Sequence, residues 1–349
     1  MTWETIESWN VGLDVTALNG RFSGAFDVFN RTKKEMIGKA PELSSMLGTS
    51  VPKVNNADME SYGWELEVNW RDMIGDFSYG VKLVLSDDQQ KITRYTNKSM
   101  NLDTWYPGRM NGEIWGYTTV GIANTDQEIQ DHLKDNRPSW GSNWAAGDIM
   151  YADLNGDGVV NNGKNTLDEH GDLSIIGNSI PRYKYGVTLD AAWKGFDIRA
   201  FFQGIGKRDY VLGGPYFWGA IGNGMWQASG FKEHWDFWRP EGHELGANLN
   251  SYYPRADFNG GKNTSTQTRY LQNASYMRLK NLQIGYALPK NVTDMLKIQR
   301  ARFYVSGDNL LTFSDITGVF DPELLGGDWG EGKLYPLSKV ISVGVNINF

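Results

Sequence analysis

LSKVISVGVNINF, residues 337–349, decides the predicted fold class, because from Ser338 onward its residues alternate without a break. Successive side chains of a β-strand point to opposite faces, so a period of two predicts an extended segment with two distinct faces. One face carries Lys339, Ile341, Val343, Val345, Ile347 and Phe349, and the other carries Ser338, Val340, Ser342, Gly344, Asn346 and Asn348. The stretch therefore predicts a strand with one apolar side that ends on a bare aromatic residue.

The same period of two recurs along the chain. In YKYGVTLDAAW, residues 183–193, one face is formed by Tyr183, Tyr185, Val187, Leu189, Ala191 and Trp193. Comparable runs predict further strands at 9–16, 21–31, 64–71, 77–86, 196–203, 279–288 and 302–313. We expect an all-β chain of roughly ten strands, many about ten residues long, whereas strands of soluble sheets usually have five or six residues.

Two antiparallel architectures explain such strands. In a soluble sandwich the apolar face packs on a second sheet, whereas in a transmembrane β-barrel lipid solvates the outer face. Crossing a bilayer requires about nine to eleven residues per tilted strand, which matches the expected length. Aromatic residues at predicted strand ends fit a girdle at the lipid–water boundary. Examples are Trp9, Trp64, Trp70, Trp193 and Phe349. The pattern favours the barrel.

The predicted connections fall into two classes of length. Short turns are expected at Asn19-Gly20, Asp72–Gly75 and Lys194-Gly195. Long connections are expected at 33–59, 87–180 and 206–276, and structureless loops of that length are uncommon in compact domains. Short turns on one side and long extracellular loops on the other are typical of outer-membrane barrels.

Composition narrows the possible partners. The 349 residues carry a net charge of −7 without a Lys/Arg-rich block, which argues against nucleic acid as a partner. The chain has no cysteine, so disulfides and thiolate metal sites are excluded. It has no apolar run long enough for a transmembrane helix. The opening MTWETIESWNVGLDV does not have the pattern of a signal peptide.

DLNGDG, residues 153–158, has the spacing of the first half of a calcium-binding loop. Asp153, Asn155 and Asp157 place oxygen ligands at every second position, and Gly158 permits a sharp turn. In the same register, Val159 would contribute its backbone carbonyl. We therefore expect a structural Ca²⁺ here, and the alternative is a loop of Asx turns without metal.

The second half of this loop departs from the EF-hand pattern. Position twelve is Lys164 instead of the bidentate glutamate, which excludes a standard EF-hand. The closing carboxylate would have to be Asp168, Glu169 or Asp172.

Aromatic residues are concentrated in the predicted long loops. Exposed rings there are candidates for contact with a substrate or a partner protein. The candidates are Trp105, Trp115, Trp140, Trp144, Trp218 and Trp226. The alternative is that most of them pack in small cores of the loops themselves. The four histidines have no HExxH or Ser/His/Asp spacing around them, so no enzyme is predicted.

A series of short motifs extends along the whole chain. The motifs are TWETIESWNVGLD at Thr2, GEIWGYTTVGI at Gly112, GDIMYADLNGDGVV at Gly147, IIGNSIPRYKYGV at Ile175, AFFQGIGKRDY at Ala200, SYMRLKNLQIGYALPK at Ser275, RFYVSGDNLLTF at Arg302, FDPEL at Phe320 and the terminal YPLSKVISVGVNINF. Their order resembles the C-terminal part of the SusC/RagA-type TonB-linked outer-membrane transporters of Bacteroidetes. Each motif is weak alone, but their common order covers essentially all 349 residues.

The resemblance implies a barrel of twenty-two strands, of which this chain would form about the last ten. It further implies that residues 1–349 are a fragment, with the signal peptide, TonB box and plug domain of such transporters absent. It assigns Asp172 as the later aspartate of the calcium loop. In this family the terminal aromatic, here Phe349, is part of the signal for barrel assembly.

The implied function is TonB-energised uptake of oligosaccharides or peptides across the outer membrane. The partners would be a SusD-like surface lipoprotein, outer-membrane lipid and, through the missing N-terminal region, the TonB–ExbB–ExbD system. The alternative is a secreted all-β carbohydrate-binding or adhesion module with a calcium-stabilised loop.

Overall fold

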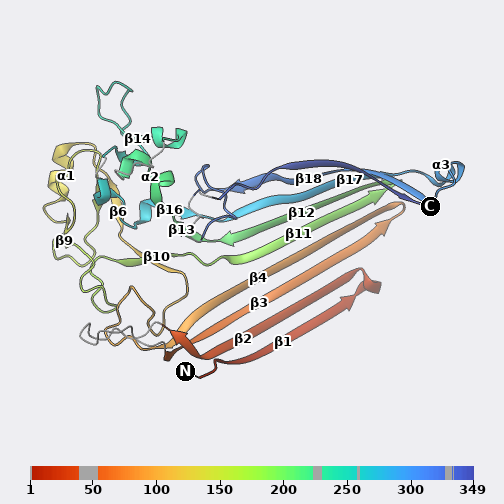
Figure 1. Ribbon diagram of the computed structural model, residues 1–349, viewed down its shortest axis with the longest axis horizontal. Helices are drawn as coiled ribbons and strands as arrows, with labels where there is room; N and C mark the ends of the chain where they lie inside the picture. Colours follow the sequence, from red (N-terminus) through yellow and green to blue (C-terminus); the bar gives the residue numbers. More distant parts are fainter. Residues whose placement is uncertain (1, 39–53, 223–229, 258–259, 327–331, 333) are drawn as a thin grey trace.

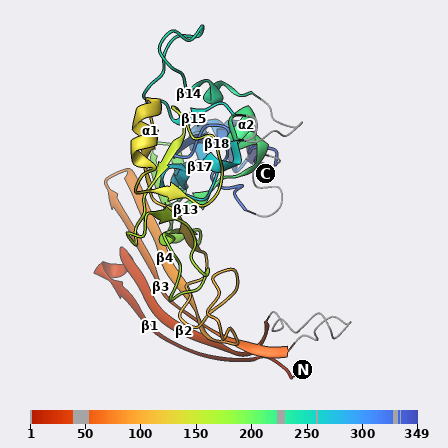
Figure 2. The same ribbon diagram turned by 90° about the vertical axis from the view of Figure 1, so that its left-hand side faces the viewer.

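A nine-stranded antiparallel sheet dominates the computed structural model, which describes residues 2–38, 54–222, 230–257, 260–326, 332 and 334–349 (Figure 1). Its strands, in spatial order, are β1 (Thr5–Ala17), β2 (Phe22–Gly38), β3 (Val54–Ile74), β4 (Phe77–Tyr95), β11 (Arg182–Trp193), β12 (Phe196–Lys207), β17 (Tyr276–Ala287), β18 (Arg300–Ser314) and β19 (Val340–Asn348). The spatial order follows the chain order, so the sheet is a simple meander. The sheet is curved when it is seen from its side (Figure 2).

The strand register separates an apolar face from a polar face. Leu189 on β11 pairs with Val81 on β4 and Ala200 on β12. The next residue, Asp190, pairs with Gly80 and Arg199. The apolar row continues across the sheet with side chains that remain exposed, among them Val11, Leu13, Val81, Leu189, Ile198, Ile284, Val305, Ile341 and Val343. Val343 is 80% exposed, so the sheet does not bury this face against the described residues.

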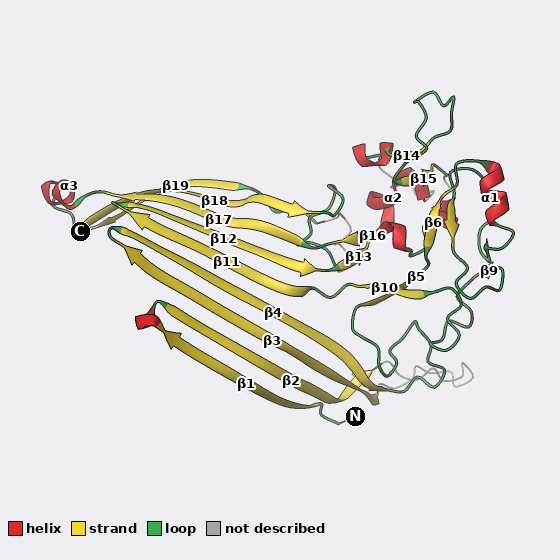
Figure 3. Cartoon of the chain, turned by 180° about the vertical axis from the view of Figure 1, so that it is seen from behind, coloured by secondary structure: helices red, strands yellow, loops and turns green. Residues whose placement is uncertain are grey.

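Short turns connect the strands at one end of the sheet, as predicted (Figure 3). Trp193 pairs with Phe196, and the two residues between them, Lys194 and Gly195, have φ values of 47° and 91°. Two positive φ values define a type I′ turn, whose twist matches that of the flanking strands. At this end, η1 (Leu18–Gly20) joins β1 to β2, and α3 (Lys290–Met295) lies between β17 and β18.

Two predicted boundaries were wrong. The β3–β4 turn lies at Gly75 and Asp76, because Ile74 pairs with Phe77 and Asp72 still belongs to β3. The other ends of these strands extend well into the predicted loops 33–59 and 87–180, so β3 has 21 residues and β4 has 19. In β3 and β4 the alternation of apolar and polar residues ends before the backbone hydrogen-bond ladder does. Beyond that point, pairs of polar residues continue the hairpin. Arg94, for example, donates from Nε to Asp58 Oδ2 at 2.7 Å.

The long connections gather at the opposite end of the sheet, where they fold into a body of their own (Figures 1 and 3). We call the described residues of 96–181, 208–275 and 315–326 the cap. Its elements are β5 (Glu113–Gly116), β6 (Thr119–Ile122), α1 (Asp126–His132), β7 (Arg137–Pro138), β8 (Ile149–Tyr151), β9 (Val159–Val160), β10 (Ser174–Asn178), β13 (Asp209–Val211), α2 (Gly214–Gly222), η3 (Lys232–Trp235), β14 (Phe237–Trp238), β15 (Tyr253–Arg255), η4 (Gly260–Asn263), η5 (Thr268–Tyr270) and β16 (Leu271–Asn273).

The largest hydrophobic core lies in the cap and not on the sheet. Its buried members include Ile149, Tyr151, Val160, Leu212, Phe217, Trp218, Tyr253, Tyr270 and Phe320. A folded cap explains how such long connections are tolerated. The cap therefore has the packing of a small domain, while the sheet leaves its apolar residues exposed.

The prediction of a mostly β chain is confirmed, and the nine strands of the main sheet are antiparallel. In the cap, however, β7 pairs with β9 and β14 with β15 in parallel. Within the described residues, β1 and β19 each pair on one side only, so the sheet is open. None of the helices in this part of the chain is long and apolar enough to cross a membrane.

Candidate ligand-binding site

A buried charge network joins two of the three segments that form the cap, the described residues of 96–181 and 208–275. Asp148 is fully buried, and its Oδ1 accepts hydrogen bonds from Arg255 Nε at 2.8 Å and Asn263 Nδ2 at 2.9 Å. Its Oδ2 lies 2.9 Å from Lys262 Nζ and accepts from the backbone N–H of Ala145 at 2.9 Å. A buried carboxylate is tolerated when charge partners and hydrogen bonds satisfy it in this way. Asp148 therefore fixes Arg255, Lys262 and Asn263 against the first long connection.

Three of the predicted contact tryptophans pack inside the cap. Trp140 lies 4.7 Å from Tyr117, and its Nε1 donates to the Lys262 carbonyl at 3.2 Å. Trp144 carries Lys262 Nζ over its ring at 5.3 Å. Trp218 is only 5% exposed. These positions suit a structural role, and contact with a substrate or partner stays a prediction for them.

The other predicted contact residues have different surroundings. Trp115 donates from Nε1 to Glu113 at 2.6 Å, and its ring lies 5.4 Å from His170. Trp105 is half-buried and packs edge-on against Tyr95 at 5.8 Å. Trp226 lies outside the described residues. Phe349 follows β19 and is 86% exposed.

The predicted calcium loop brings its acidic residues together around backbone N–H groups. Asp153 accepts from Gly156 N and Gly158 N, each at 2.7 Å, while Asp172 accepts from Leu154 N at 2.7 Å and Asn161 N at 2.8 Å. Burial raises the pKa of Asp153, but these backbone hydrogen bonds and contact with Asp172 outweigh it, so its pKa lies below the ordinary 3.8. The stabilising interactions of this carboxylate are therefore present at neutral pH and lost as the pH falls through the folded-state pKa.

The remaining predicted ligands fit a hard cation in part. Asn155 Oδ1 accepts from Asp157 N at 2.9 Å, Asp157 Oδ1 accepts from Val159 N at 2.8 Å, and the Val159 carbonyl accepts from Asn161 Nδ2 at 2.8 Å. All of these acceptors are oxygens, as Ca²⁺ requires. Within the described ranges, however, no three His, Cys, Asp or Glu side chains converge as a metal site. The loop has the ligand chemistry of a calcium site but not a closed set of carboxylates.

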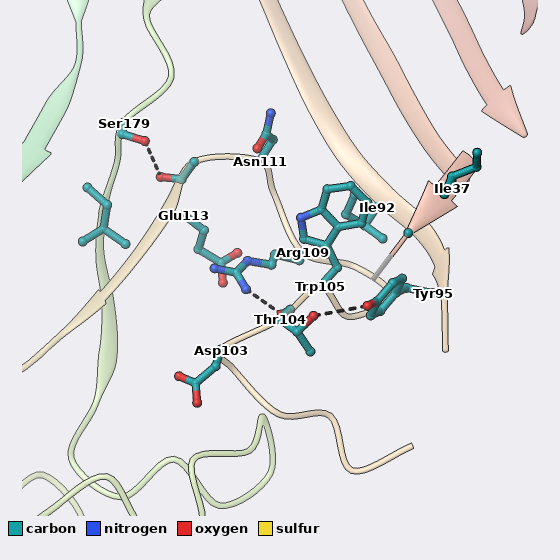
Figure 4. A pocket seen from close by; sticks show the side chains of 13 residues that line it. Ile37, Ile92, Tyr95, Asp103, Thr104, Trp105, Arg109, Asn111, Glu113 and Ser179 are labelled. Atoms are coloured by element: carbon teal, nitrogen blue, oxygen red, sulfur yellow. Dashed lines mark hydrogen bonds between the residues drawn. The ribbon is translucent and has the colours of Figure 1, made fainter. Parts of the chain in front are cut away.

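A cavity of about 450 Å³ lies where the long ends of β2 and β4 meet the cap (Figure 4). Such a volume is within the range of small-molecule sites. Its wall combines apolar, aromatic and hydrogen-bonding side chains. It is lined by Ile37, Gly38, Ile92, Tyr95, Asp103, Thr104, Trp105, Arg109, Asn111, Gly112, Glu113, Ile114 and Ser179.

Hydrogen bonds hold two charged residues of this cavity in place. Arg109 Nη1 donates to the carbonyls of Leu102 at 2.9 Å and Thr104 at 2.6 Å. Glu113 accepts from the Tyr106 hydroxyl, from Trp115 Nε1 and from Met110 N. Burial, followed by this contact with Glu113, raises the pKa of Tyr106 to about 12, so its hydroxyl remains a donor at neutral pH. The cavity wall is therefore preorganised.

Comparison with known proteins identifies the family. Residues 1–310 match the family described as TonB dependent receptor-like, beta-barrel. The chain belongs to this family. The resemblance that the motif order indicated is thereby confirmed. TonB-dependent receptors are receptors and transporters and not enzymes, in agreement with the prediction.

This TonB-dependent receptor chain also aligns with individual relatives. It is 27% identical to TonB-dependent receptor P3 of Formosa agariphila, over 100% of this chain and 34% of that protein. It is 22% identical to TonB-dependent receptor SusC of Bacteroides thetaiotaomicron, over 100% of this chain and 32% of SusC. The chain thus spans about a third of the length of these curated relatives.

Solved structures share the fold of this chain. The structure of the RagAB peptide transporter matches with a TM-score of 0.70 and 24% identity, over 100% of this chain and 36% of that chain. The RagAB peptide importer in its 'open-open' state matches with a TM-score of 0.71 and 22% identity, over 100% and 35%.

Sequence reasoning missed the residues that organise the cap and the cavity. Asp148 and Lys262 are 114 positions apart by their numbers, and no local motif links them. Arg109 and Asn111 lie in a segment without periodicity, inside the predicted long connection 87–180. Two signals pointed to the cavity: Trp105, a contact candidate in a predicted loop, and the motif GEIWGYTTVGI, whose Gly112, Glu113 and Ile114 line the cavity.

Proposed function

We propose that this chain forms part of the wall of an outer-membrane barrel that imports a nutrient. The proposal depends most on one observation. One face of the curved antiparallel sheet carries exposed apolar side chains all the way from Val11 on β1 to Val343 on β19. A face of this kind is stable where hydrocarbon solvates it. Membership in the TonB-dependent receptor family supports the same function.

The sidedness of the molecule agrees with this proposal. Short turns and Phe349 lie at one end of the strands and the folded cap at the other (Figure 1). In outer-membrane barrels the short turns face the periplasm and the longer loops face outward. We place the cap on the extracellular side, where nutrient enters.

The proposed whole protein is larger than this chain. The chain would supply nine strands of a barrel of about twenty-two, and β1 and β19 would pair with strands contributed by the rest of the polypeptide. Energy would come from the TonB–ExbB–ExbD system acting on a plug, and a SusD-like lipoprotein would cover the extracellular mouth. The similarity to RagAB and to SusC supports this arrangement.

Alkaline extraction and nutrient uptake test the proposal. We expect the full-length polypeptide that contains this chain to stay in the membrane pellet at high pH, and its deletion to abolish growth on one oligosaccharide or peptide source. A tonB deletion should produce the same growth defect. Release of the polypeptide into the soluble fraction as a monodisperse protein would contradict import and favour a secreted binding module.

We further propose that the 153–172 loop holds a structural Ca²⁺ through Asp153, Asn155, Asp157, the Val159 carbonyl and Asp172. Asp153 and Asp172 are in side-chain contact, and with the Asn155, Asp157 and Val159 oxygens they form a set of oxygen ligands of the kind that Ca²⁺ prefers. We expect calorimetry to detect Ca²⁺ binding by the wild type and its loss in Asp153→Ala. Asp168→Ala, in the same loop, is the matched control and should bind normally. If the wild type and Asp153→Ala released identical heats on titration with Ca²⁺, the proposed calcium site would be refuted.

Phe349 is proposed as part of the signal for barrel assembly. Its side chain is 86% exposed at the end of β19 and is available to an assembly factor. We expect Phe349→Ala to reduce the amount of heat-modifiable, folded protein in the outer membrane several-fold, whereas Asn348→Ala should not. Equal amounts of folded protein for the two variants would refute this role.

A further inference from the structure

We propose that the cavity beside Trp105 binds one or two rings of a neutral oligosaccharide. This inference rests on the proposed import function. It specifies the chemical class of the imported nutrient and the cavity at which this nutrient binds. The cavity, of about 450 Å³, combines an indole with hydroxyl, amide and charged groups, as Figure 4 shows. A pyranose ring has an apolar face and a rim of hydroxyls, and such a wall complements both.

Trp105 provides the apolar platform. Its ring packs edge-on against Tyr95 and joins the small core of Ala57, Ile92 and Tyr95, which fixes its orientation. Its backbone carbonyl accepts from Asn97 Nδ2 at 3.0 Å, which anchors the main chain at this residue. The indole is nevertheless half-exposed and lines the cavity. A rigid, partly exposed aromatic side chain loses little conformational entropy when a ligand stacks on it.

Hydrogen-bonding groups that include charges of both signs surround that platform. Asp103 is exposed at the cavity and carries a negative charge, while Arg109 carries a positive one. Glu113 is already occupied by three donors. Asn111 donates from Nδ2 to Gln90 Oε1 at 2.8 Å, which directs its amide within the wall. With two carboxylates and one guanidinium, the lining disfavours an anionic ligand, while groups of both charge signs can form hydrogen bonds with hydroxyl groups.

The backbone around the cavity argues against an extended peptide as the occupant. Peptides are commonly recognised by pairing with a free strand edge. Here the edge of β4 is covered by the chain itself, since Ile92 N donates to the Arg109 carbonyl at 2.9 Å and Gly108 N donates to the Ile92 carbonyl at 2.7 Å. Asn111 N also donates to the Gln90 carbonyl at 2.8 Å. Recognition must therefore use side chains, which suits a ligand rich in hydroxyls.

The test uses the full-length polypeptide that contains this chain, purified in detergent. One series of calorimetric titrations would use neutral hexasaccharides of glucose, xylose, mannose and galactose. A second series, which tests the competing ligand class, would use hexapeptides of glycine, serine and alanine. We expect at least one hexasaccharide to bind. Trp105→Leu, which retains the apolar contact with Ile92, should weaken that binding by about tenfold or more. Asp103→Ala should weaken it several-fold.

Trp235→Leu is the matched control, because Trp235 is 60% exposed on η3 and does not line the cavity. Its affinity should equal that of the wild type. Hexasaccharide binding that is unchanged in Trp105→Leu and Asp103→Ala would overturn the site while leaving import intact. Binding of the peptides only, or of no hexasaccharide, would overturn the ligand class. Failure of the import function itself would appear separately, as a polypeptide that leaves the membrane at high pH.

Discussion

Replacing Asp148 by alanine is expected to open the cap while leaving the nine-stranded sheet assembled. The substitution removes the buried carboxylate that Arg255 and Lys262 share, and leaves them the longer contacts with Asp257 at 3.8 Å. Removing one partner of a buried ion pair costs about 3–5 kcal/mol. The sheet does not depend on this network, since its strands are joined by their own ladders. Hydrogen exchange should therefore rise sharply in peptides covering 145–151 and 255–267 and stay unchanged in β11 and β12.

The control for this prediction lies in the same connection. Asp131 forms an exposed ion pair with Lys134 at 2.6 Å on the surface of the cap. Surface pairs of this kind contribute little to stability, so Asp131→Ala should leave hydrogen exchange of the cap unchanged. If Asp148→Ala and Asp131→Ala gave the same exchange pattern, the buried network would not hold the cap together.

Introducing arginine at Leu189 is expected to destabilise the folded barrel by about 2–4 kcal/mol, the range for a cation on the lipid face near the bilayer midplane. Leu189 lies midway along β11 between Tyr185 and Trp193, and it is 41% exposed on the apolar face. The measurement is the fraction of heat-modifiable protein in the outer membrane and the unfolding midpoint in detergent. Both should fall relative to the wild type.

Thr188→Arg is the matched variant for Leu189→Arg. Thr188 is the neighbouring residue on the polar face and pairs with Lys82, whose charge is neutralised by Glu67 at 2.7 Å. The same side chain introduced one position away should therefore be tolerated. Equal destabilisation by the two substitutions would show that the two faces of β11 do not differ in their surroundings.

The sheet could be predicted from the sequence because its determinants are local. Alternation along 183–193 places six residues on one face of the strand. This placement follows from the strand's own sequence and does not depend on which strand lies next to it. The strand ends were less predictable. The β3–β4 hairpin continues through polar pairs such as Asp58 and Arg94, which carry no apolar periodicity.

The cap could not be predicted in the same way, because its contacts join distant parts of the chain. Tyr151 Oη donates to the Lys262 carbonyl at 2.9 Å, across 111 positions. Residue pairs that are so far apart in the chain produce no local spacing pattern, so a single sequence cannot show that they are in contact. The loop that we propose to hold Ca²⁺ is intermediate: the DLNGDG spacing predicts its first candidate ligands, whereas Asp172 is assigned by the family resemblance. Trp105 was singled out as an exposed-loop aromatic, but the cavity that it lines depends on the fold.

The central claim is that hydrocarbon, and not a protein layer, surrounds the apolar face of the sheet. Because the chain has no cysteine of its own, spin labels at single introduced cysteines report each face separately. Labels at 189 and 343 should be accessible to oxygen and protected from a water-soluble nickel complex, and labels at 190 and 342 should show the reverse. Labels at 189 and 343 that neither reagent reaches would mean that protein covers this face, and the importer assignment would fail.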